Sequence, residues 1–282
     1  MKAHKIENQH FSEERSLYNL KETEVSYCNF EGEPDGESVM KETRDCVAKS
    51  CLFNLRYPLW HGHNLKVEEC KFLDNARAPL WYCHHLKLIN NDFNNIKTLR
   101  ECTDIEIKGG HIVSPEFGWK NDGIKGEDFY LDSVYAFLDS KNITLRNINF
   151  KGKYSFQYID NLTIEDSILD TKDAFWHSKN VTVKNCIVKG EYLAWFSENI
   201  TFINCKISGT QPLCYVKNLV MKNCTMEDCD LAFEYSSCDV ELKGTLKSIK
   251  NPSSGTIIID EPTEVIIGDN VYPVNGKVIV RN

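Results

Sequence analysis

A short phrase returns along this chain at a nearly constant interval and limits the folds that the chain can adopt. It consists of an apolar residue, a usually small residue three positions later, and a second apolar residue two positions beyond. From Gly110 to Cys224 successive copies lie 19 residues or twice 19 apart, and the double step contains a weaker copy around Phe129 and Leu131. The copies are Val25/Cys28/Phe30, Ala48/Cys51/Phe53, Val67/Cys70/Phe72, Leu88/Asn91/Phe93, Ile107/Gly110/Ile112, Leu145/Ile148/Phe150, Ile164/Ser167/Leu169, Val183/Cys186/Val188, Phe202/Cys205/Ile207 and Met221/Cys224/Met226. So regular a period indicates stacked supersecondary units.

A column of asparagines supports this register. Stacked Asn side chains can hydrogen-bond along a parallel sheet, and Asn suits a tight turn that every coil repeats. After each Asn the sequence alternates apolar, Thr and apolar residues, as in 143–145, which predicts a strand with its apolar side chains inside. The column consists of Asn142, Asn161, Asn180, Asn199 and Asn218, with Asn64, His85 and Asp104 at the same phase in earlier copies.

The length of the repeat selects the architecture. Nineteen residues are too few for a strand, a helix and their turns, but they suit three short strands with turns. The phrase of leucine-rich repeats is absent, and so is the six-residue period of left-handed β-helices. We predict an all-β fold, a single-stranded right-handed parallel β-helix (solenoid) of about 11–12 coils. One domain would cover 1–282, with an N-terminal cap over 1–20, coils over 21–243 and C-terminal cap strands over 244–282.

Composition narrows the partners and the compartment. The 282-residue chain carries a formal net charge of −8 and its basic residues are scattered, which argues against a nucleic-acid partner. No segment approaches the roughly 18–20 apolar residues that span a bilayer, and residues 1–10 lack the apolar core of a signal peptide. We therefore expect a cytoplasmic protein without a membrane partner, in which the twelve cysteines stay reduced.

The repeat explains half of the cysteines. No Cys-x-x-Cys pair occurs, so the sequence predicts neither a zinc ribbon nor a thioredoxin-like site. A buried thiol packs as a small hydrophobe, which suits the small position of the repeat. The cysteines expected in this inward column are Cys28, Cys51, Cys70, Cys186, Cys205 and Cys224.

One side of each coil is richer in aromatic and charged residues than packing requires. All five tryptophans share one phase of the repeat, beside a column rich in Leu and Phe and between two polar columns. If this stretch alternates like a regular strand, the polar columns face solvent and the tryptophans point inward, whereas a bulge would reverse the assignment. The tryptophans are Trp60, Trp81, Trp119, Trp176 and Trp195.

The polar columns supply the candidate site. Aromatic rings stack on pyranose faces and carboxylates bind hydroxyls, so an aromatic and acidic surface suits a saccharide. Asp139 and His177 lie two coils apart, roughly 10 Å, which is compatible with paired acid and base groups. The candidate catalytic residues are Lys120, Asp139 and His177, and the candidate ligand-binding residues are Glu101, Glu116, Tyr154, Tyr158, Asp173 and Tyr192. The alternatives are a solvated charged face and an interface with another subunit.

Four histidines gather in the N-terminal third of the chain, at His61, His63, His84 and His85. Imidazole binds transition metals, but His85 occupies the position of the turn ladder and no carboxylate is placed to support a ligand. We therefore predict no metal site and no cofactor.

Several phrases resemble an uncharacterised bacterial family, domain-of-unknown-function family 3737. They are LRYPLW (55–60), SPEFGWK (114–120), KYSFQY (153–158), DTKDAFWH (170–177) and GTQPLCY (209–215). The likeness covers nearly the whole chain. It implies a pectate-lyase-like right-handed β-helix and a bacterial, cytoplasmic protein, and it supplies no activity and no catalytic residues to carry over.

Two functions stay open at this point. The first is a protein that binds or processes carbohydrate, resembling a polysaccharide lyase or glycoside hydrolase if it is an enzyme. The second is a non-catalytic scaffold or homo-oligomerising protein. The paired aspartates and the Gly-His-Gly and Arg-Ile-Lys phrases of polygalacturonases have only faint counterparts in 121–123 and 110–111, and the fold alone does not confer their chemistry.

Overall fold

The computed structural model of the protein describes residues 4–33, 36–268 and 271–281. These residues form strands and turns without any helix, so no helix among them could cross a membrane. The chain divides into two compact units, unit 1 (1–148) and unit 2 (149–282), where the sequence predicts one domain. Each unit is described by itself below.

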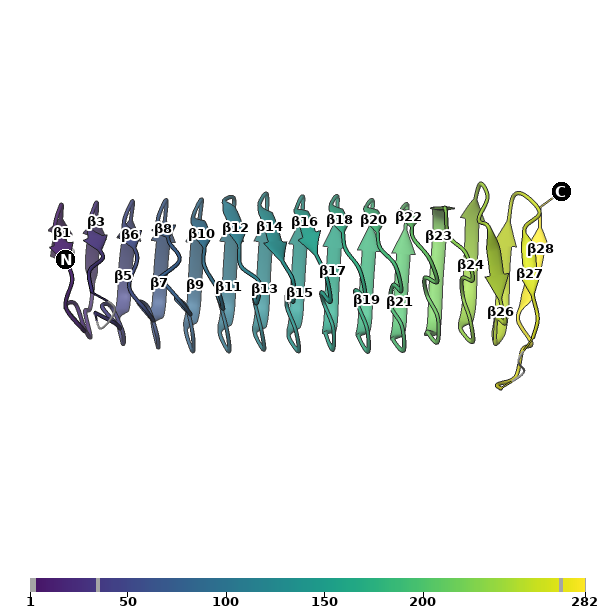
Figure 1. The fold of residues 1–282 in the computed structure, drawn as a ribbon, viewed down its shortest axis with the longest axis horizontal. Coiled ribbons are helices and arrows are strands. Elements are labelled where there is room, and N and C mark those ends of the chain that lie inside the picture. Colours follow the sequence, from purple (N-terminus) through teal and green to yellow (C-terminus); the bar gives the residue numbers. More distant parts are fainter. Residues whose placement is uncertain (1–3, 34–35, 269–270, 282) are drawn as a thin grey trace. The chain divides into compact units, whose positions relative to one another are not determined.

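Unit 1 is a parallel β-solenoid in which each coil contributes one long and one short strand (Figure 1). Long strands pair with long strands and short with short, so that His63 lies beside His84 and Phe53 beside Phe72. The long strands are β1 (His4–Glu7), β3 (Thr23–Ser26), β5 (Arg44–Lys49), β7 (His63–Glu68), β9 (His84–Ile89), β11 (Thr103–Lys108), β13 (Asp122–Glu127) and β15 (Lys141–Arg146). The short strands are β2 (His10–Phe11), β4 (Asn29–Phe30), β6 (Leu52–Phe53), β8 (Lys71–Phe72), β10 (Asp92–Asn94), β12 (His111–Val113) and β14 (Tyr130–Ser133).

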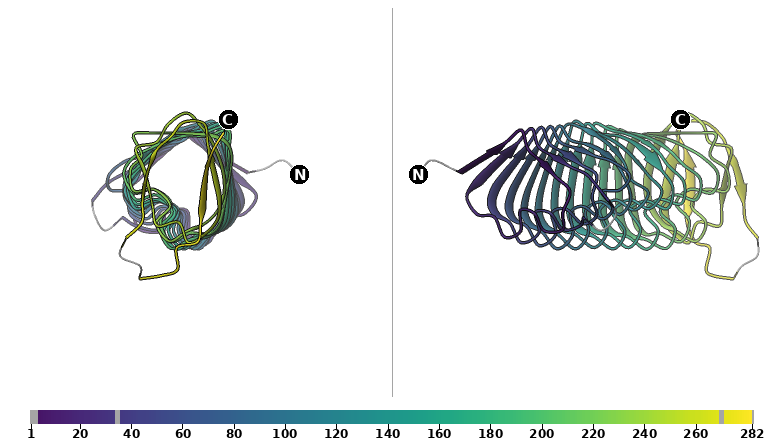
Figure 2. Two further views of the ribbon diagram at one scale, coloured as in Figure 1. Left: turned by 90° about the vertical axis from the view of Figure 1, so that its right-hand side faces the viewer. Right: turned by 60° about the vertical axis from the view of Figure 1, so that its left-hand side comes forward.

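Unit 2 repeats the same construction, and Figure 2 shows the coils of each unit stacked one behind another. Its long strands are β17 (Asp160–Glu165), β19 (Lys179–Lys184), β21 (Glu198–Ile203), β23 (Lys217–Glu227), β24 (Ser237–Lys243), β26 (Ser254–Ile259) and β28 (Lys277–Val280). Its short strands are β16 (Asn149–Gly152), β18 (Ile168–Asp170), β20 (Ile187–Lys189) and β22 (Lys206–Ser208), and β22 pairs with the end of β23. A separate pair joins β25 (Ser248–Lys250) to β27 (Glu264–Ile266).

The predicted β-helix is confirmed, with three differences. The two units together hold about 14 turns rather than 11–12. Each coil has two strands, and its third side is a run of turns bridged to neighbouring coils by backbone hydrogen bonds such as His61 N–H to Trp81 O (3.0 Å). Residues 4–11, expected within a cap, form β1 and β2 and pair with β3 and β4 like the later coils.

The repeat phrase lines the core. Phe30, Phe53, Phe72 and Phe93 are fully buried and stack in one column, with ring centroids 4.4–4.8 Å apart. The weaker copy of the repeat phrase is confirmed, since Phe129 and Leu131 are buried as well. All twelve cysteines are free and buried, which includes the six predicted for the inward column. Burial of these rings and thiols removes apolar surface from water, which stabilises the fold by about 25 cal/mol per Å² of buried area.

The asparagine ladder is confirmed, and a second ladder runs beside it. Asn199 donates to Asn180 and Asn218 donates to Asn199, each at 2.9 Å. The second ladder follows the end of the long strand, where Asn204 donates to Asn185 (3.0 Å) and Asn223 to Asn204 (2.7 Å). These residues have φ of 53–58°, the left-handed region that Asn tolerates better than most residues.

Of the two orientations left open for the tryptophans, the structure shows that they do not point inward. Trp176 and Trp195 are only partly buried and stack on one another outside the core (5.5 Å), while Phe175 beside them is fully buried. The backbone conformation explains this orientation, because side chains on the third side of the coil do not alternate between inside and outside as they do on a strand. Asp173, Phe175 and His177 all have φ of 52–62°, so left-handed residues alternate with the others and reverse the expected parity.

Candidate functional site

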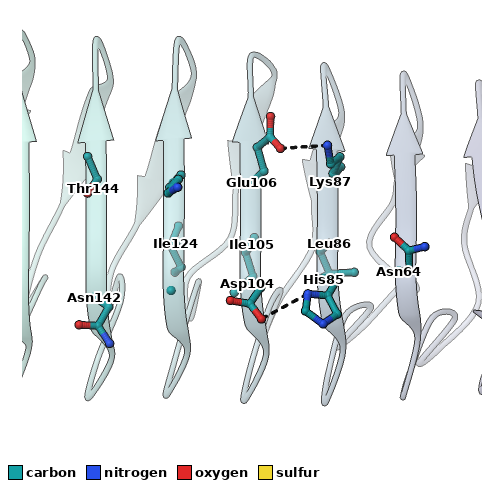
Figure 3. Close-up of a pocket in the computed structure, with 12 residues that line it drawn as sticks. Asn64, His85, Leu86, Lys87, Asp104, Ile105, Glu106, Ile124, Asn142 and Thr144 are labelled. Atoms are coloured by element: carbon teal, nitrogen blue, oxygen red, sulfur yellow. Dashed lines mark ion pairs between the residues drawn. The ribbon is translucent and has the colours of Figure 1, made fainter. Parts of the chain in front are cut away.

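A hollow of about 410 Å³ lies on the outer face of the long strands of unit 1. It extends from β7 to β15, and Figure 3 shows it bordered by two rows of polar side chains. Inward residues such as Leu86, Ile105 and Ile124 form its floor, where the alternation of the strands leaves the backbone open to solvent. None of the candidate site residues predicted from the sequence lines this hollow.

The first row stands at the position directly after the first buried residue of each strand. Lys87, Glu106, Lys125 and Thr144 occupy it on β9, β11, β13 and β15, and all four are exposed. Lys87 Nζ lies 3.4 Å from a Glu106 oxygen (Figure 3). Lys125 makes no ion pair with any residue that the structure describes. The row therefore offers a carboxylate, a hydroxyl and one ammonium group whose donors are open to a ligand.

The second row is the turn ladder at the start of the same strands. It passes through Asn64, His85, Asp104, Gly123 and Asn142, in pairing order. His85 Nδ1 lies 3.3 Å from Asp104 Oδ2, as Figure 3 shows. Gly123 has no side chain to continue the ladder. The Asn142 amide instead donates to Asp122 Oδ1 (2.7 Å), and this hydrogen bond lowers the pKa of Asp122.

Two further hollows continue the first along the same face. One, of about 320 Å³, borders Lys108 and Glu127, whose ion pair measures 2.8 Å. The other, of about 190 Å³, borders Asp45 and Lys66. The Glu127 hydrogen bond raises the pKa of Lys108, so this ammonium group keeps its charge at neutral pH. Together the hollows follow the face from β5 to β15.

This face differs in charge from the chain as a whole. Strands β5, β7, β9, β11, β13 and β15 carry eight Lys or Arg and six Asp or Glu, while the whole chain has a formal net charge of −8. Along β9, β11 and β13, Lys87, Glu106 and Lys125 alternate in sign from one coil to the next, which spaces hydrogen-bond donors and acceptors at the distance between strands, about 4.8 Å. Such a surface offers repeated polar contacts to a long ligand.

The sequence-predicted residues of unit 1 lie on the third side of the coils, away from the hollow. Lys120 and Asp139 are exposed on adjacent coils, and the Lys120 N–H donates to Leu138 O (2.9 Å). Glu101 is exposed and lies 3.6 Å from Arg100, whose guanidinium stacks over Trp81 and Trp119. None of the three hollows is lined by these residues or by Glu116.

Two of the predicted residues of unit 2, Tyr158 and His177, belong to an aromatic ladder. Tyr158, His177, Phe196 and Tyr215 stack face to face, with ring centroids 4.7–5.4 Å apart. Because each ring covers the face of its neighbour, the ladder presents ring edges to solvent. The face-on stacking on a sugar that motivated this choice is therefore not available between these rings.

Asp173 is the one buried carboxyl group among the predicted residues. It is 7% exposed, and burial raises its pKa, an effect partly offset by Lys172 and Lys153. Its backbone carbonyl accepts a hydrogen bond from Gln157 (2.9 Å), which replaces the Trp indole donor found in other coils. Tyr192 lies in the next coil, with Lys172 over its ring at 5.5 Å. His177 belongs to the aromatic ladder, and the catalytic role of Lys120, Asp139 and His177 stays a prediction.

The histidines make other contacts. His84 Nδ1 is within hydrogen-bond distance of the Thr103 hydroxyl (2.8 Å), and His85 pairs with Asp104. Among the described residues, no group of three or more His, Cys, Asp or Glu side chains is arranged to hold a metal ion.

Residues 4–279 match the family described as protein of unknown function, DUF3737. The chain belongs to this family. No curated protein matches the chain.

Several solved structures match this DUF3737 protein. A mutant tailspike protein of E. coli bacteriophage HK620, solved with a pentasaccharide, has 10% identity and a TM-score of 0.49, over 98% of this chain and 70% of that one. PfbA, a surface adhesin of Streptococcus pneumoniae, has 9% identity and a TM-score of 0.43, over 84% and 77%. The A-module of the Azotobacter vinelandii mannuronan C-5 epimerase AlgE6 has 9% identity and a TM-score of 0.33, over 100% and 91%. At these values the similarity carries no argument about activity.

Proposed function

We propose that this protein binds a saccharide chain along the outer face of β5–β15. The observation that carries the proposal is the hollow of about 410 Å³, open to solvent and bordered by two parallel rows of hydrogen-bonding side chains. Sugar hydroxyls both donate and accept, so they match a surface on which Lys87 and Lys125 alternate with Glu106 and Asp104.

The regular spacing of the coils favours a chain over a small molecule. Three hollows follow one another on the same face, and each coil repeats the same two rows. A ligand with its own repeat can use the same contact several times, and affinity then grows with the number of contacts engaged. Water-mediated contacts add to this, because exposed charged side chains hold bridging waters.

We propose that the protein binds the saccharide chain, and a separate experiment tests whether it also cleaves that chain. Paired acid and base groups of a glycosidase need carboxyl groups facing one scissile bond. In the hollow, Asp104 pairs with His85 and Glu106 with Lys87, so both carboxylates are already engaged with a cation or an imidazole. Incubation of a bound glycan with the protein, followed by measurement of new reducing ends, decides whether it is also cleaved.

A glycan array tests the proposal, followed by calorimetric titration with the strongest hit. We expect Lys125→Met and Asp104→Asn to weaken binding roughly tenfold each, because each removes a hydrogen bond to a charged group, worth about 1.5–3 kcal/mol. Lys222→Met is the matched control, since Lys222 is an exposed lysine on the outer face of β23 in unit 2. A blank array with folded protein would overturn the proposal.

The aromatic ladder of unit 2 favours a second candidate, self-association. Tyr158 and Phe196 are 54% and 47% exposed, and Tyr215 continues the same row. Contiguous exposed aromatic side chains are typical of protein interfaces. This candidate concerns a different face and does not compete with the saccharide site of unit 1.

A further inference from the structure

We propose that the gap at Gly123 is a specificity subsite that accepts the exocyclic hydroxymethyl group of a hexose unit. The inference rests on the saccharide-binding function proposed above and adds the kind of sugar unit that the site selects. It starts from the one position in the turn ladder of unit 1 that lacks a side chain.

The backbone at this position does not require glycine. The other ladder residues, Asp45, Asn64, His85, Asp104 and Asn142, have φ of 53–57°, and Gly123 has φ of 79°. All lie in the left-handed region, which Asn and Asp tolerate. An Asn or Asp at position 123 would therefore continue the ladder that these five neighbours form.

Packing does not require glycine here either. A Cβ on Gly123 would meet Asp104 Oδ1 at 3.5 Å and nothing closer, which is ordinary van der Waals contact. By contrast, a Cβ on Gly255 would lie 2.0 Å from Cys238 O, and one on Gly209 would lie 2.1 Å from Gly190 O, both of them backbone atoms. Those glycines are imposed by their surroundings. At Gly123 the missing side chain leaves room that the protein itself does not use.

The walls of the gap carry matched hydrogen-bonding groups. Asp104 uses Oδ2 toward His85, and its Oδ1 is the atom nearest to the missing Cβ. Lys125 stands two residues farther along β13 on the same outer face, without an ion pair to any described residue. Asn142 stands on the far side of the gap (Figure 3), and its amide donates to Asp122 Oδ1.

These dimensions suit a hydroxymethyl group. Its methylene takes the place that a side-chain Cβ would occupy, and its hydroxyl donates to Asp104 Oδ1 while a neighbouring ring hydroxyl accepts from Lys125. A pentose unit has no such group, and a 6-deoxy unit has the carbon without the hydroxyl. Either would leave the Asp104 oxygen to water, so the preference for a hexose unit equals the hydrogen bond to this charged group that is lost.

The test uses matched glycans that differ only in this group, such as cellohexaose and xylohexaose, within an array of hexose, pentose and 6-deoxy forms of the same linkage. We expect the wild-type protein to bind the hexose member roughly tenfold more tightly. Gly123→Asn fills the gap and should lower hexose binding to the pentose level without changing pentose binding. Gly244→Asn is the matched control, because Gly244 has φ of 76° and nothing within 4 Å of its Cβ position, outside the hollow.

The outcomes separate the two proposals. If the wild-type protein binds no glycan, the saccharide function fails and the subsite with it. If it binds glycans but treats hexose and pentose members alike, or if Gly123→Asn keeps the hexose preference, the subsite alone is overturned. Melting temperature verifies that the Gly123→Asn variant is folded, and it should stay close to the wild-type value because Asn tolerates the left-handed backbone of this position better than most residues do. Asp104→Asn provides a second variant, expected to weaken hexose binding more than pentose binding.

Discussion

At the scale of single residues, the cysteines are the most unusual feature of the core. Burial raises the pKa of the Cys214, Cys229 and Cys238 thiols to about 12 in each case. Cys214 and Cys229 are fully buried, so their thiolates have no access to water. Such thiols act as small hydrophobes that must stay protonated in the folded state, and they should be unreactive until the protein unfolds.

This protonation makes stability depend on pH in a defined direction. Because the folded pKa lies above the unfolded value of about 8.5, the folded state binds the proton more tightly. The stabilisation is complete below pH 8.5 and falls as pH rises toward 12, by about 1.4 kcal/mol per pH unit for each buried thiol. We expect the urea midpoint to fall between pH 8 and pH 10. Cys214→Ala should be less stable at pH 7 but show a shallower fall, and an unchanged slope would contradict the argument.

The candidate site was only partly accessible from single residues. Asn64, His85, Asp104 and Asn142 could be placed in one column from their spacing, and the structure confirms this column. The hollow next to it was not predicted, because a hollow is defined by a missing side chain at Gly123 and by charges on the outward positions of strands. The sequence does show an alternation of Lys and Glu at strand positions 87, 106 and 125, but the predicted site was based on aromatic columns.

At the scale of the elements, the backbone of the third side explains why two nearby columns of side chains differ in burial. The long strands obey period two, so their inward residues could be predicted. The third side has a left-handed residue at every second position, and Phe175 and Phe196 both have φ near 60° although one is buried and the other exposed. Local hydrogen bonds to neighbouring coils, such as Phe175 N–H to Ser155 O (2.9 Å), hold this conformation and are invisible to a periodicity argument.

This geometry gives a matched pair of substitutions. Phe175 is fully buried and stacks on Phe156 (5.2 Å), so Phe175→Ala should lower the free energy of unfolding by about 3–5 kcal/mol. Phe196 is 47% exposed, and Phe196→Ala should cost only about 0.5–1.5 kcal/mol, the worth of its contacts with His177 and Tyr215. Urea unfolding measures both, and equal losses would show that the two columns are not separated by burial.

At the scale of the whole molecule, the repeat could predict the fold because every coil satisfies the next one by the same contacts. A residue and its counterpart 19 positions later share a column, so one correct register assigns the inward face of most coils. What the repeat cannot assign is the use of the outward faces. Their side chains make few contacts inside the chain, and their composition is therefore free to serve partners.

The aromatic ladder of unit 2 is the outward face that should report a partner of the same kind. If its exposed rings cover one another in a second copy, the protein should form a concentration-dependent dimer in analytical ultracentrifugation. Phe196→Glu places a charge among the rings and should yield monomers, because an unpaired charge is costly to bury. Ile187→Glu is the control, an exposed apolar residue of β20 outside the ladder, and should leave the dimer intact. Phe156 and Phe175 cannot serve this test, since both are fully buried and a charge there would unfold the protein. A wild type that sediments as a monomer at every concentration, or a Phe196→Glu variant that remains dimeric, would remove the ladder as a self-association surface.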